Sequence, residues 1–227
     1  VRTKDRPHLL TRCLQSLAEQ TRLPDEIIVV NDGGTAVAEV ISLFPNLTIH
    51  LLTNATNQGR ARAGNQGVQQ AQSQVIGFLD DDDRLLPDHL QRLEQAMVQF
   101  DAKVAYAGCR LLQRDLLGDQ VILQEQAIGQ FNEPFEAERL RYENYIPLIN
   151  LLIDHELWEQ VGGFDETFDI FEDWDILLRL SQQTPFYHLN RITTEYAIWG
   201  TNQVTQASDK QRWLKAYRQI LSKHLFS

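Results

Sequence analysis

The chain reads Val75-Ile76-Gly77-Phe78-Leu79-Asp80-Asp81-Asp82-Asp83 in its first half, and this stretch decides the fold. Its mostly apolar beginning predicts a buried strand, and the four aspartates mark the carboxyl end of that strand. The run Ile27–Val30 has the same form and is followed by Asn31-Asp32-Gly33-Gly34, which predicts a sharp turn. Ligands of α/β sheets bind beyond the carboxyl ends of the strands. We therefore expect a ligand site where these two strands end.

Helices and a further strand alternate with these two strands. The spacing of apolar residues predicts helices over 7–20, 37–44, 59–72 and 88–100, and an apolar run predicts a strand over 47–52. This alternation predicts an α/β fold with a mainly parallel sheet covered by helices on both faces. Val1-Arg2-Thr3 has the character of the end of a strand, so we expect that first strand to be truncated.

The second half of the chain is less regular. We expect strands near Val104–Gln113, Gln120–Gln126 and Thr193–Trp199, and helices over 156–161, 172–182 and 213–221. The polar and aromatic stretch Asn132–Tyr145 predicts a long loop, and long loops in compact domains are often functional. No linker or internal repeat is visible, so we expect a single domain over residues 1–227.

Composition excludes several classes of protein. The net charge of −10 argues against binding to nucleic acid, which needs clustered cations, but it is compatible with one small phosphorylated ligand held through a divalent cation. Cys13 and Cys109 form no CxxC pair, which favours free thiols in a reducing compartment, and hence a cytoplasmic protein. We find no signal peptide and no run of the ~18–20 apolar residues that a membrane span requires.

The aspartate run is the first candidate site. Carboxylate oxygens are preferred ligands of Mg²⁺ and Mn²⁺, and Mg²⁺ commonly uses one or two protein carboxylates together with substrate phosphates. A metal held there could stabilise a departing diphosphate. The same run also fits a solvated acidic turn before the helix that follows Pro87, so both interpretations stay open.

The second candidate is Glu172-Asp173-Trp174-Asp175 at a predicted helix start. Acidic residues are ordinary in a first helical turn, where they meet free N–H groups and the helix dipole. One carboxylate could instead serve as general base toward an acceptor hydroxyl. Trp174 could stack on a sugar face or lie buried in the core.

Taken together, the motifs resemble family 2 glycosyltransferases of the GT-A fold. They occur in the family's order and cover nearly the whole chain: Thr3–Pro7, Val29–Gly34, Asn57-Gln58-Gly59, Phe78–Asp83, Gly162–Glu166 and Glu172–Asp175. The resemblance implies a three-layer α/β/α sandwich, with residues 1–100 as the nucleotide-binding half and residues 101–227 as the acceptor-binding half. It also implies an inverting, metal-dependent, hexosyltransferase-like enzyme of polysaccharide biosynthesis, acting by in-line displacement.

The resemblance also implies roles for single residues. Thr3 and Asp32 would line the base and ribose pocket, with Asp32 accepting a hydrogen bond from the nucleobase. Asp80 and Asp82 match the ends of the Asp-x-Asp motif; Asp80 would face the ribose or the metal, and Asp82 would ligate Mn²⁺ or Mg²⁺. Asp173 matches the catalytic base. We place Asp81 and Arg60 with the donor nucleotide, and Glu172 and Trp174 with the acceptor.

Two departures from the family pattern concern the donor site. Gly64 stands where Arg is usual, so that Arg60 or Arg62 would have to supply the cation, unless both are surface residues. Tyr196-Ala197-Ile198-Trp199 replaces the family's Tyr-Arg-x-His, whose His can help to hold the metal or diphosphate, and the nearby His188 lies too early to substitute. These changes concern metal affinity and the grip on the diphosphate.

The predicted partners are a nucleotide-diphosphate sugar and a sugar, lipid-linked or protein acceptor, with peripheral membrane contact left open. A catalytically weak nucleotide-sugar-binding module is an alternative, supported by the missing Arg and His. A sugar nucleotidyltransferase is another, although Thr3–Pro7 lacks that class's Gly-rich phosphate loop. An Asp-nucleophile phosphatase would require an Asp-x-Asp-x-Thr continuation that the acidic run lacks.

Overall fold

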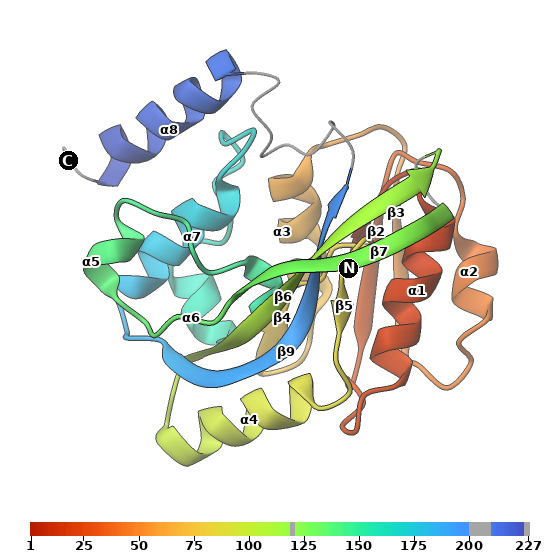
Figure 1. Cartoon of the computed structure of the whole chain (residues 1–227), viewed down its shortest axis with the longest axis horizontal. Helices are drawn as coiled ribbons and strands as arrows, with labels where there is room; N and C mark the ends of the chain where they lie inside the picture. The colour runs from red at the N-terminus through yellow and green to blue at the C-terminus, as the bar shows by residue number, and fades with distance from the viewer. Residues whose placement is uncertain (119–120, 200–209, 225–227) are drawn as a thin grey trace.

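The computed structural model describes residues 1–118, 121–199 and 210–224, which form two joined sheets with helices on both faces (Figure 1). The first sheet has the order β1-β2-β3, with strands Arg2–Thr3, Ile27–Asp32 and Ile49–Asn54. The second has the order β4-β8-β6-β9-β5, with strands Val75–Gly77, Leu151–Asp154, Val104–Leu117, Tyr187–Trp199 and Arg84–Leu85. A parallel bridge between Arg2 and Asp80 joins the two sheets.

The prediction of a mainly parallel (mixed) sheet is confirmed in part, because parallel pairing dominates only in the first half. β1, β2 and β3 pair in parallel, but in the second sheet only β6 and β9 do so. The pairs β4–β8, β6–β8, β5–β9 and β6–β7 are antiparallel, where β7 is Val121–Phe131. β6 and β7 form a hairpin, and a short connection of this kind can join only antiparallel strands. The alpha/beta class is confirmed, and the sheet as a whole is mixed.

The helices cover the two faces of the sheets. On one face lie α1 (Pro7–Ala18), α2 (Ala38–Ser42) and α4 (His89–Phe100), which pack their apolar sides against β2, β6 and β8. On the other lie α3 (Arg60–Gln70), α6 (His155–Gln160), α7 (Glu172–Ser181) and α8 (Lys210–His224), which share one hydrophobic cluster with β4 and β6. The helices predicted from apolar spacing are therefore present.

Side chains of β6 show how the layers are separated. Val104 and Tyr106 belong to the core under α6 and α7, whereas Ala105 and Ala107 belong to the core under α4. Successive side chains of a strand point to opposite faces, so a strand buried on both faces shows a continuous apolar run rather than an alternating pattern. The small alanines lie on the α4 side, where Leu93 and Met97 fill the space.

Sequence patterns missed the shortest elements. β5 and β8 have two and four residues, which is too short for a periodic pattern to be visible. The loop predicted over Asn132–Tyr145 contains one short helix, α5 (Ala137–Leu140), and a 3₁₀ turn at Leu148–Asn150 leads into β8. The predicted start of β7 at Gln120 lies outside the described residues.

Gly64 of α3 packs against the ring of Phe164. A Cβ at position 64 would lie 2.5 Å from Phe164 Cε2. Asn65 holds the same residue in place, because its Nδ2 donates to Phe164 O at 2.9 Å and its Oδ1 accepts from Phe164 N at 2.8 Å. The glycine that departs from the family pattern therefore permits close contact between α3 and the Gly162–Glu166 segment.

No helix among the described residues is both long and apolar enough to cross a bilayer. Cys13 and Cys109 are buried and not joined to each other.

Gly64→Ala is expected to lower the free energy of unfolding by about 1 to 3 kcal/mol, because the new methyl group overpacks the contact with Phe164. Gly67→Ala in the same helix is the matched control, since its Cβ would lie 3.4 Å from Val30 Cγ2, an ordinary contact. The control should be unchanged or more stable, by up to about 1 kcal/mol, because alanine favours the helix. Urea unfolding measures both; equal losses would contradict the packing argument.

Candidate active site

A cavity of about 540 Å³ lies at the carboxyl ends of β1 and β2 and beside the acidic run. Five residues predicted from the sequence contribute to its wall: Thr3, Asp32, Arg60, Asp80 and Asp82. They come from segments far apart in the chain and meet because parallel strands end at the same edge of a sheet. We call this the donor cavity.

A second cavity of about 280 Å³ contains Asp173. Its wall includes Arg2, Arg60, Asp80 and Tyr196, which also belong to the wall of the donor cavity. The two cavities therefore adjoin along these four residues, and the acidic run and Asp173 lie on either side of this boundary. We call the second one the acceptor-side cavity.

Arg2 connects the two sides. Its guanidinium donates to Asp80, with Nε–Oδ1 at 2.9 Å and Nη2–Oδ2 at 3.1 Å, and Nη1 lies 3.3 Å from Glu172 Oε1. Burial disfavours the charged form of Asp80, but Arg2 and Arg60 outweigh that effect and hold the pKa of Asp80 below its ordinary value. Asp80 therefore lies in the cavity wall as a carboxylate paired with Arg2.

The four aspartates form a turn, in which Asp83 N donates to Asp80 O at 3.0 Å, and they differ in exposure. Asp80 and Asp82 keep 29% and 17% of their side chains exposed, whereas Asp81 and Asp83 are buried. Asp83 Oδ1 accepts from Ala197 N at 2.7 Å, which ties the run to β9. Burial and the neighbouring carboxylates raise the pKa of Asp83.

Asp81, predicted to lie with the donor nucleotide, is buried outside the wall of the donor cavity. Asp81 is 1% exposed and does not contribute to the donor cavity. Its Oδ2 accepts from Thr3 Oγ1 at 2.6 Å and from Arg6 Nε at 3.2 Å. It therefore holds the end of β1 and the start of α1 beneath the cavity.

Asp82 is held by three side chains. Its Oδ2 accepts from Arg6 Nη1 and from Trp199 Nε1, each at 3.0 Å, and the Arg6 guanidinium lies 5.7 Å from the Trp199 ring centroid. The backbone carbonyl of Asp82 accepts from Arg114, whose Nε is 2.5 Å from Glu125 on β7. Figure 1 shows the β6–β7 hairpin, which carries Arg114 and Glu125, running across the molecule to α1. Trp199, which stands where the family has His, therefore orients this carboxylate.

The donor set fits a divalent metal that shares its ligands with a phosphorylated substrate. Within residues 1–118, 121–199 and 210–224, no group of three His, Cys, Asp or Glu side chains could hold a metal ion. Asp80 and Asp82 nevertheless both face the donor cavity. Mg²⁺ typically binds through one or two protein carboxylates plus substrate phosphates, and this arrangement needs no third protein ligand.

Asp32 organises the loop that enters α3. Its Oδ1 accepts from Gln58 N and Asn54 Nδ2, each at 2.8 Å, and its Oδ2 accepts from Gly59 N at 2.9 Å. Gly59 has φ of 91°, in the left-handed region that favours glycine. Asp32 therefore shapes the cavity wall, and its Oδ2 has room for a further donor.

Glu172, predicted to bind the acceptor, lies outside the walls of both cavities. Glu172 is fully buried and belongs to neither cavity wall. Its Oε1 accepts from Arg60 Nε at 2.8 Å and lies 3.3 Å from Arg2 Nη1. Glu172 therefore fixes the two arginines between the cavities instead of meeting the acceptor.

Trp174, predicted either to stack on a sugar or to lie in the core, lies in the core. Trp174 is 2% exposed, so it cannot offer a face to a sugar. Its Nε1 donates to Leu140 O at 2.7 Å, and its ring packs against Phe171 and Tyr217. It attaches the 132–145 loop to α7.

Asp173 lies in the acceptor-side cavity with Asn144. Its Oδ2 accepts from Asn144 Nδ2 at 3.2 Å, and its Oδ1 accepts from Trp174 N at 2.8 Å. Burial and the neighbouring Glu172 raise the pKa of Asp173 above its ordinary value, against the opposing effect of Arg60. A carboxylate with a raised pKa is a stronger proton acceptor at neutral pH.

Tyr196 belongs to both cavity walls. Burial and the surrounding carboxylates raise the pKa of its hydroxyl, because a phenolate there would meet Asp83 and Asp173. Tyr196 is therefore a neutral hydroxyl between the two sides. His188 stacks on Tyr106 and belongs to neither wall.

Comparison with known proteins identifies this arrangement. The family model for glycosyl transferase family 2 matches residues 1–149, more than half of the 227 residues. The chain belongs to glycosyl transferase family 2. It is therefore a glycosyltransferase, and the resemblance drawn from the ordered motifs is confirmed.

Curated relatives of this family 2 glycosyltransferase cover most of its length. An uncharacterised glycosyltransferase of Bacillus subtilis strain 168, YwdF, is 26% identical over 92% of this chain and 78% of its own. The chondroitin synthase of Pasteurella multocida strain Pm70 is 29% identical over 89% of this chain, which spans only 20% of that much longer protein.

Solved structures share the fold of this family 2 chain at low identity. Staphylococcus aureus TarS 1-349, solved in complex with UDP-GlcNAc, has a TM-score of 0.76 and 17% identity over 98% of this chain. The mannosyltransferase PcManGT of Pyrobaculum calidifontis, solved with GDP-Man and Mn²⁺, has a TM-score of 0.70 and 15% identity over the whole chain. The family 2 chain spans 64% and 63% of these two proteins.

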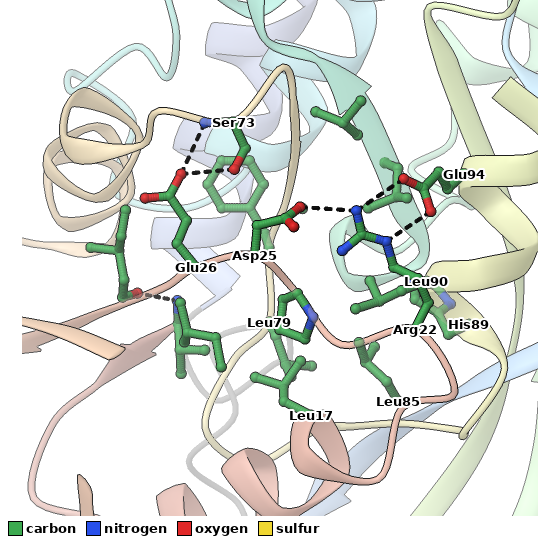
Figure 2. Close-up of a pocket in the computed structure, with 18 of the residues that line it drawn as sticks. Leu17, Arg22, Asp25, Glu26, Ser73, Leu79, Leu85, His89, Leu90 and Glu94 are labelled. Carbon is green, nitrogen blue, oxygen red and sulfur yellow. Dashed lines mark hydrogen bonds and ion pairs between the residues drawn. The ribbon is translucent and has the colours of Figure 1, made fainter. Parts of the chain in front are cut away.

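A further cavity of about 510 Å³ lies between β2 and β4, away from the family 2 site (Figure 2). None of the predicted site residues contributes to its wall. The charged side chains at its rim are paired: Arg22 contacts Glu94 and Asp25, and Glu26 accepts from Ser73. We assign no role in transfer to it.

Sequence reasoning missed several residues of this family 2 site. Arg2 directly precedes the Thr3–Pro7 motif, and Arg6 lies inside it. Tyr196 and Trp199 lie in the motif that departs from the family pattern, and Asn144 lies in the long loop predicted over Asn132–Tyr145. The four adjacent carboxylates of the acidic run require nearby hydrogen-bond donors, and this requirement could have pointed to Arg6 and Trp199. No sequence pattern singles out Asn144.

Glu172→Gln is expected to lower the free energy of unfolding by about 1 to 3 kcal/mol, because it leaves Arg60 and Arg2 without their shared carboxylate. Glu138→Gln is the control, since that side chain is 82% exposed and its change should stay within about 0.5 kcal/mol. Denaturant unfolding measures both, and a Glu172→Gln variant as stable as the parent would show that the pairing is dispensable.

Proposed function

We propose that this chain transfers a sugar from a nucleoside-diphosphate sugar to an acceptor hydroxyl with inversion at the anomeric carbon. The observation that carries the proposal is the pair of adjoining cavities, with Asp82 on one side, Asp173 on the other and Asp80 in the wall that they share. In-line displacement requires a proton acceptor on one side of the anomeric carbon and charge stabilisation on the opposite side. The two cavities supply these groups.

The donor is assigned to the larger cavity. Structural relatives bind UDP-GlcNAc and GDP-Man, so a nucleoside-diphosphate sugar is the donor class. Thr3 and Asp32 lie in the wall where the base and ribose would bind, and Asp32 Oδ2 would accept from the nucleobase. Arg60 and Arg62 contribute cations to the same wall, in place of the arginine that Gly64 replaces.

A divalent metal, Mn²⁺ or Mg²⁺, is assigned to Asp82, with Asp80 beside it. When bound, such a metal neutralises the charge of a departing diphosphate. Arg6 and Trp199 hold the Asp82 carboxylate by Oδ2 and thereby orient its other oxygen. The mannosyltransferase PcManGT was solved with Mn²⁺, which supports a metal in this fold.

Asp173 is assigned as the general base. The acceptor oxygen bonds to the anomeric carbon as the bond from that carbon to the diphosphate oxygen breaks. The bonding electrons leave with the diphosphate, and the hydroxyl proton passes to Asp173. Positioned proton transfer of this kind contributes typically ~10²–10⁴-fold to the rate.

The division into a nucleotide-binding half over residues 1–100 and an acceptor-binding half over residues 101–227 is part of the same proposal. Several residues of the second half also contribute to the wall of the donor cavity: 166–169, Tyr196, Ala197, Trp199 and Arg212. The second half therefore closes over the donor as well as binding the acceptor.

A nucleotide-sugar-binding module with weak turnover is a second candidate. Trp199 occupies the position of the family's His, and its Nε1 donates a hydrogen bond to one carboxylate oxygen of Asp82. This contact favours the alternative. Release of free sugar from UDP-GlcNAc or GDP-mannose, assayed with and without Mn²⁺, distinguishes the two: an enzyme releases sugar, and a module does not.

For the metal, we expect UDP or GDP to raise the melting temperature of the wild-type protein more in the presence of Mn²⁺ than with a chelator. Saturation at about 100 times the dissociation constant stabilises by ~2.7 kcal/mol. Asp82→Asn should remove the Mn²⁺-dependent part of the shift because it removes the anionic ligand. Asp115→Asn, at an exposed position of β6, is the control and should keep the full shift. An Asp82→Asn variant with the full shift would rule out this metal site.

For the base, Asp173→Asn should retain nucleotide binding by thermal shift and lose sugar release and transfer by ~10²–10⁴-fold. The wild-type rate should fall as the pH decreases through the raised pKa of Asp173, because only the ionised carboxylate accepts a proton. Asp115→Asn again serves as the control. Undiminished turnover in Asp173→Asn would assign the base elsewhere.

A further inference from the structure

The wall of the acceptor-side cavity combines polar and apolar side chains. The polar ones are Asp173, Asn144 and Tyr196 together with the boundary residues Arg2, Arg60 and Asp80, and the apolar ones include Leu111, Phe131, Leu148, Ile170, Phe171 and Ile198. Its volume of about 280 Å³ is just below the ~300–1,000 Å³ typical of small-ligand pockets, which suits a single ring rather than an extended chain. A wall that combines apolar side chains with hydrogen-bonding groups suits a sugar ring, which has apolar faces and a polar rim.

Phe171 is held in an unusual backbone conformation in this wall. Its φ is 69°, in the left-handed region, where a bulky residue costs about 1 to 3 kcal/mol. Such residues persist only where the surrounding structure fixes them, and Phe171 packs edge-on against Trp174 and Trp213. The result is an aromatic side chain placed directly before Glu172 and Asp173, at the cavity.

Asn144 has one of its two amide atoms without a partner. Nδ2 donates to Asp173 Oδ2 at 3.2 Å, which fixes the orientation of the amide because a carboxylate can only accept. Oδ1 is buried and accepts no hydrogen bond from any of the described residues. A buried acceptor without a donor costs about 1 to 3 kcal/mol, so the site is incomplete until a donor reaches that atom.

The position of Asn144 is fixed by its own loop. The next residue, Tyr145, is 3% exposed, and its hydroxyl accepts from Glu136 N at 2.7 Å. Trp174 Nε1 holds the same loop at Leu140. Asn144 therefore remains beside Asp173, and a molecule bound at the Asp173 carboxylate lies next to the same amide.

We propose that Asn144 positions Asp173 and also binds the acceptor, so that the acceptor is a sugar ring carrying a second hydrogen-bond donor next to the reacting hydroxyl. The reacting hydroxyl donates to Asp173, and the neighbouring hydroxyl or amide N–H donates to Asn144 Oδ1. The aromatic and aliphatic walls contact the apolar face of the ring. This inference rests on the proposed function, and it narrows the acceptor from any hydroxyl to one with two adjacent donors.

The test compares wild-type protein and Asn144→Ala on p-nitrophenyl pyranosides, with UDP-GlcNAc and GDP-mannose as donors. For a pyranoside that is glycosylated, monodeoxy analogues lacking each neighbouring hydroxyl are assayed as well. In the wild type, one analogue should lose at least ~10-fold in kcat/KM, because a site built to bond a hydroxyl rejects a substrate lacking it. The kcat/KM of Asn144→Ala for the parent pyranoside should be lower than the wild-type value by the same factor. For that analogue, the kcat/KM of Asn144→Ala should equal the wild-type value.

The positioning of Asp173 by Asn144 is measured separately, by the pH dependence of donor hydrolysis by water, a reaction that needs no acceptor. The groups that face Asp173 are Glu172 on α7, Arg60 on α3, Tyr196 on β9 and Asn144 in the loop. Asn144 favours the ionised form of Asp173, so Asn144→Ala should move the acid limb of the pH–rate profile to higher pH. Asn132→Ala, in the same loop but outside the cavity, is the control and should leave the limb unmoved.

Equal loss by Asn144→Ala on the parent pyranoside and on both analogues, or an acid limb that stays in place, would overturn the inference. Failure of the proposed function has a different result: wild-type protein would then release no sugar from either donor.

Discussion

The site depends on the ionic contacts of Arg2, which lies between Asp80 and Glu172. Its side chain is 11% exposed, while the Glu172 side chain has no exposure. Removing charges from water costs several kcal/mol per ion, so a buried cluster persists only when each charge is closely paired. Arg2 and Arg60 together face Asp80 and Glu172, and this pairing joins β1 to the end of β4 and to the start of α7. The donor side and the base side are therefore fixed relative to each other.

Carboxylates that share this region have separate tasks. Asp81 and Asp83 face inward and hold Thr3, Arg6 and β9, so half of the acidic run is structural. Asp80 and Asp82 remain partly exposed at the cavity, and Asp83 also contributes to its wall. The run forms a turn, in which Asp83 N donates to Asp80 O at 3.0 Å, so neighbouring carboxylates point in different directions. Four adjacent carboxylates are tolerated because each meets a donor: Arg2 meets Asp80, Arg6 meets Asp81 and Asp82, and the backbone N–H of Ala197 meets Asp83.

The acceptor-side cavity is held in shape by contacts that lie in the core, outside the cavity itself. Trp174 and Tyr145 attach the 132–145 loop to α7 and to itself, and this places Asn144 on Asp173. Glu172 keeps Arg60 at the boundary between the cavities. Glu172 and Trp174, which flank the proposed base Asp173 in the sequence, thus support it from inside the core. Asn144, which contacts Asp173 in the cavity, comes from a distant segment. The aromatic wall at Phe171 completes this side.

The sequence by itself determined the alpha/beta class, the helices with clear apolar spacing, and the family, because apolar periodicity and ordered motifs are local properties of the chain. It also placed Asp80, Asp82 and Asp173 at element ends, where ligand sites occur. It could not tell Asp81 from Asp82, or Glu172 from Asp173, because adjacent carboxylates are chemically alike and only burial separates them. The two-residue β5 left no periodic pattern, and a strand pattern does not reveal whether its neighbours pair in parallel or antiparallel. The partner of Asp173 was invisible because Asn144 is 29 residues away. Tertiary structure decided these points, since they depend on which groups lose water and meet a partner when distant segments pack together.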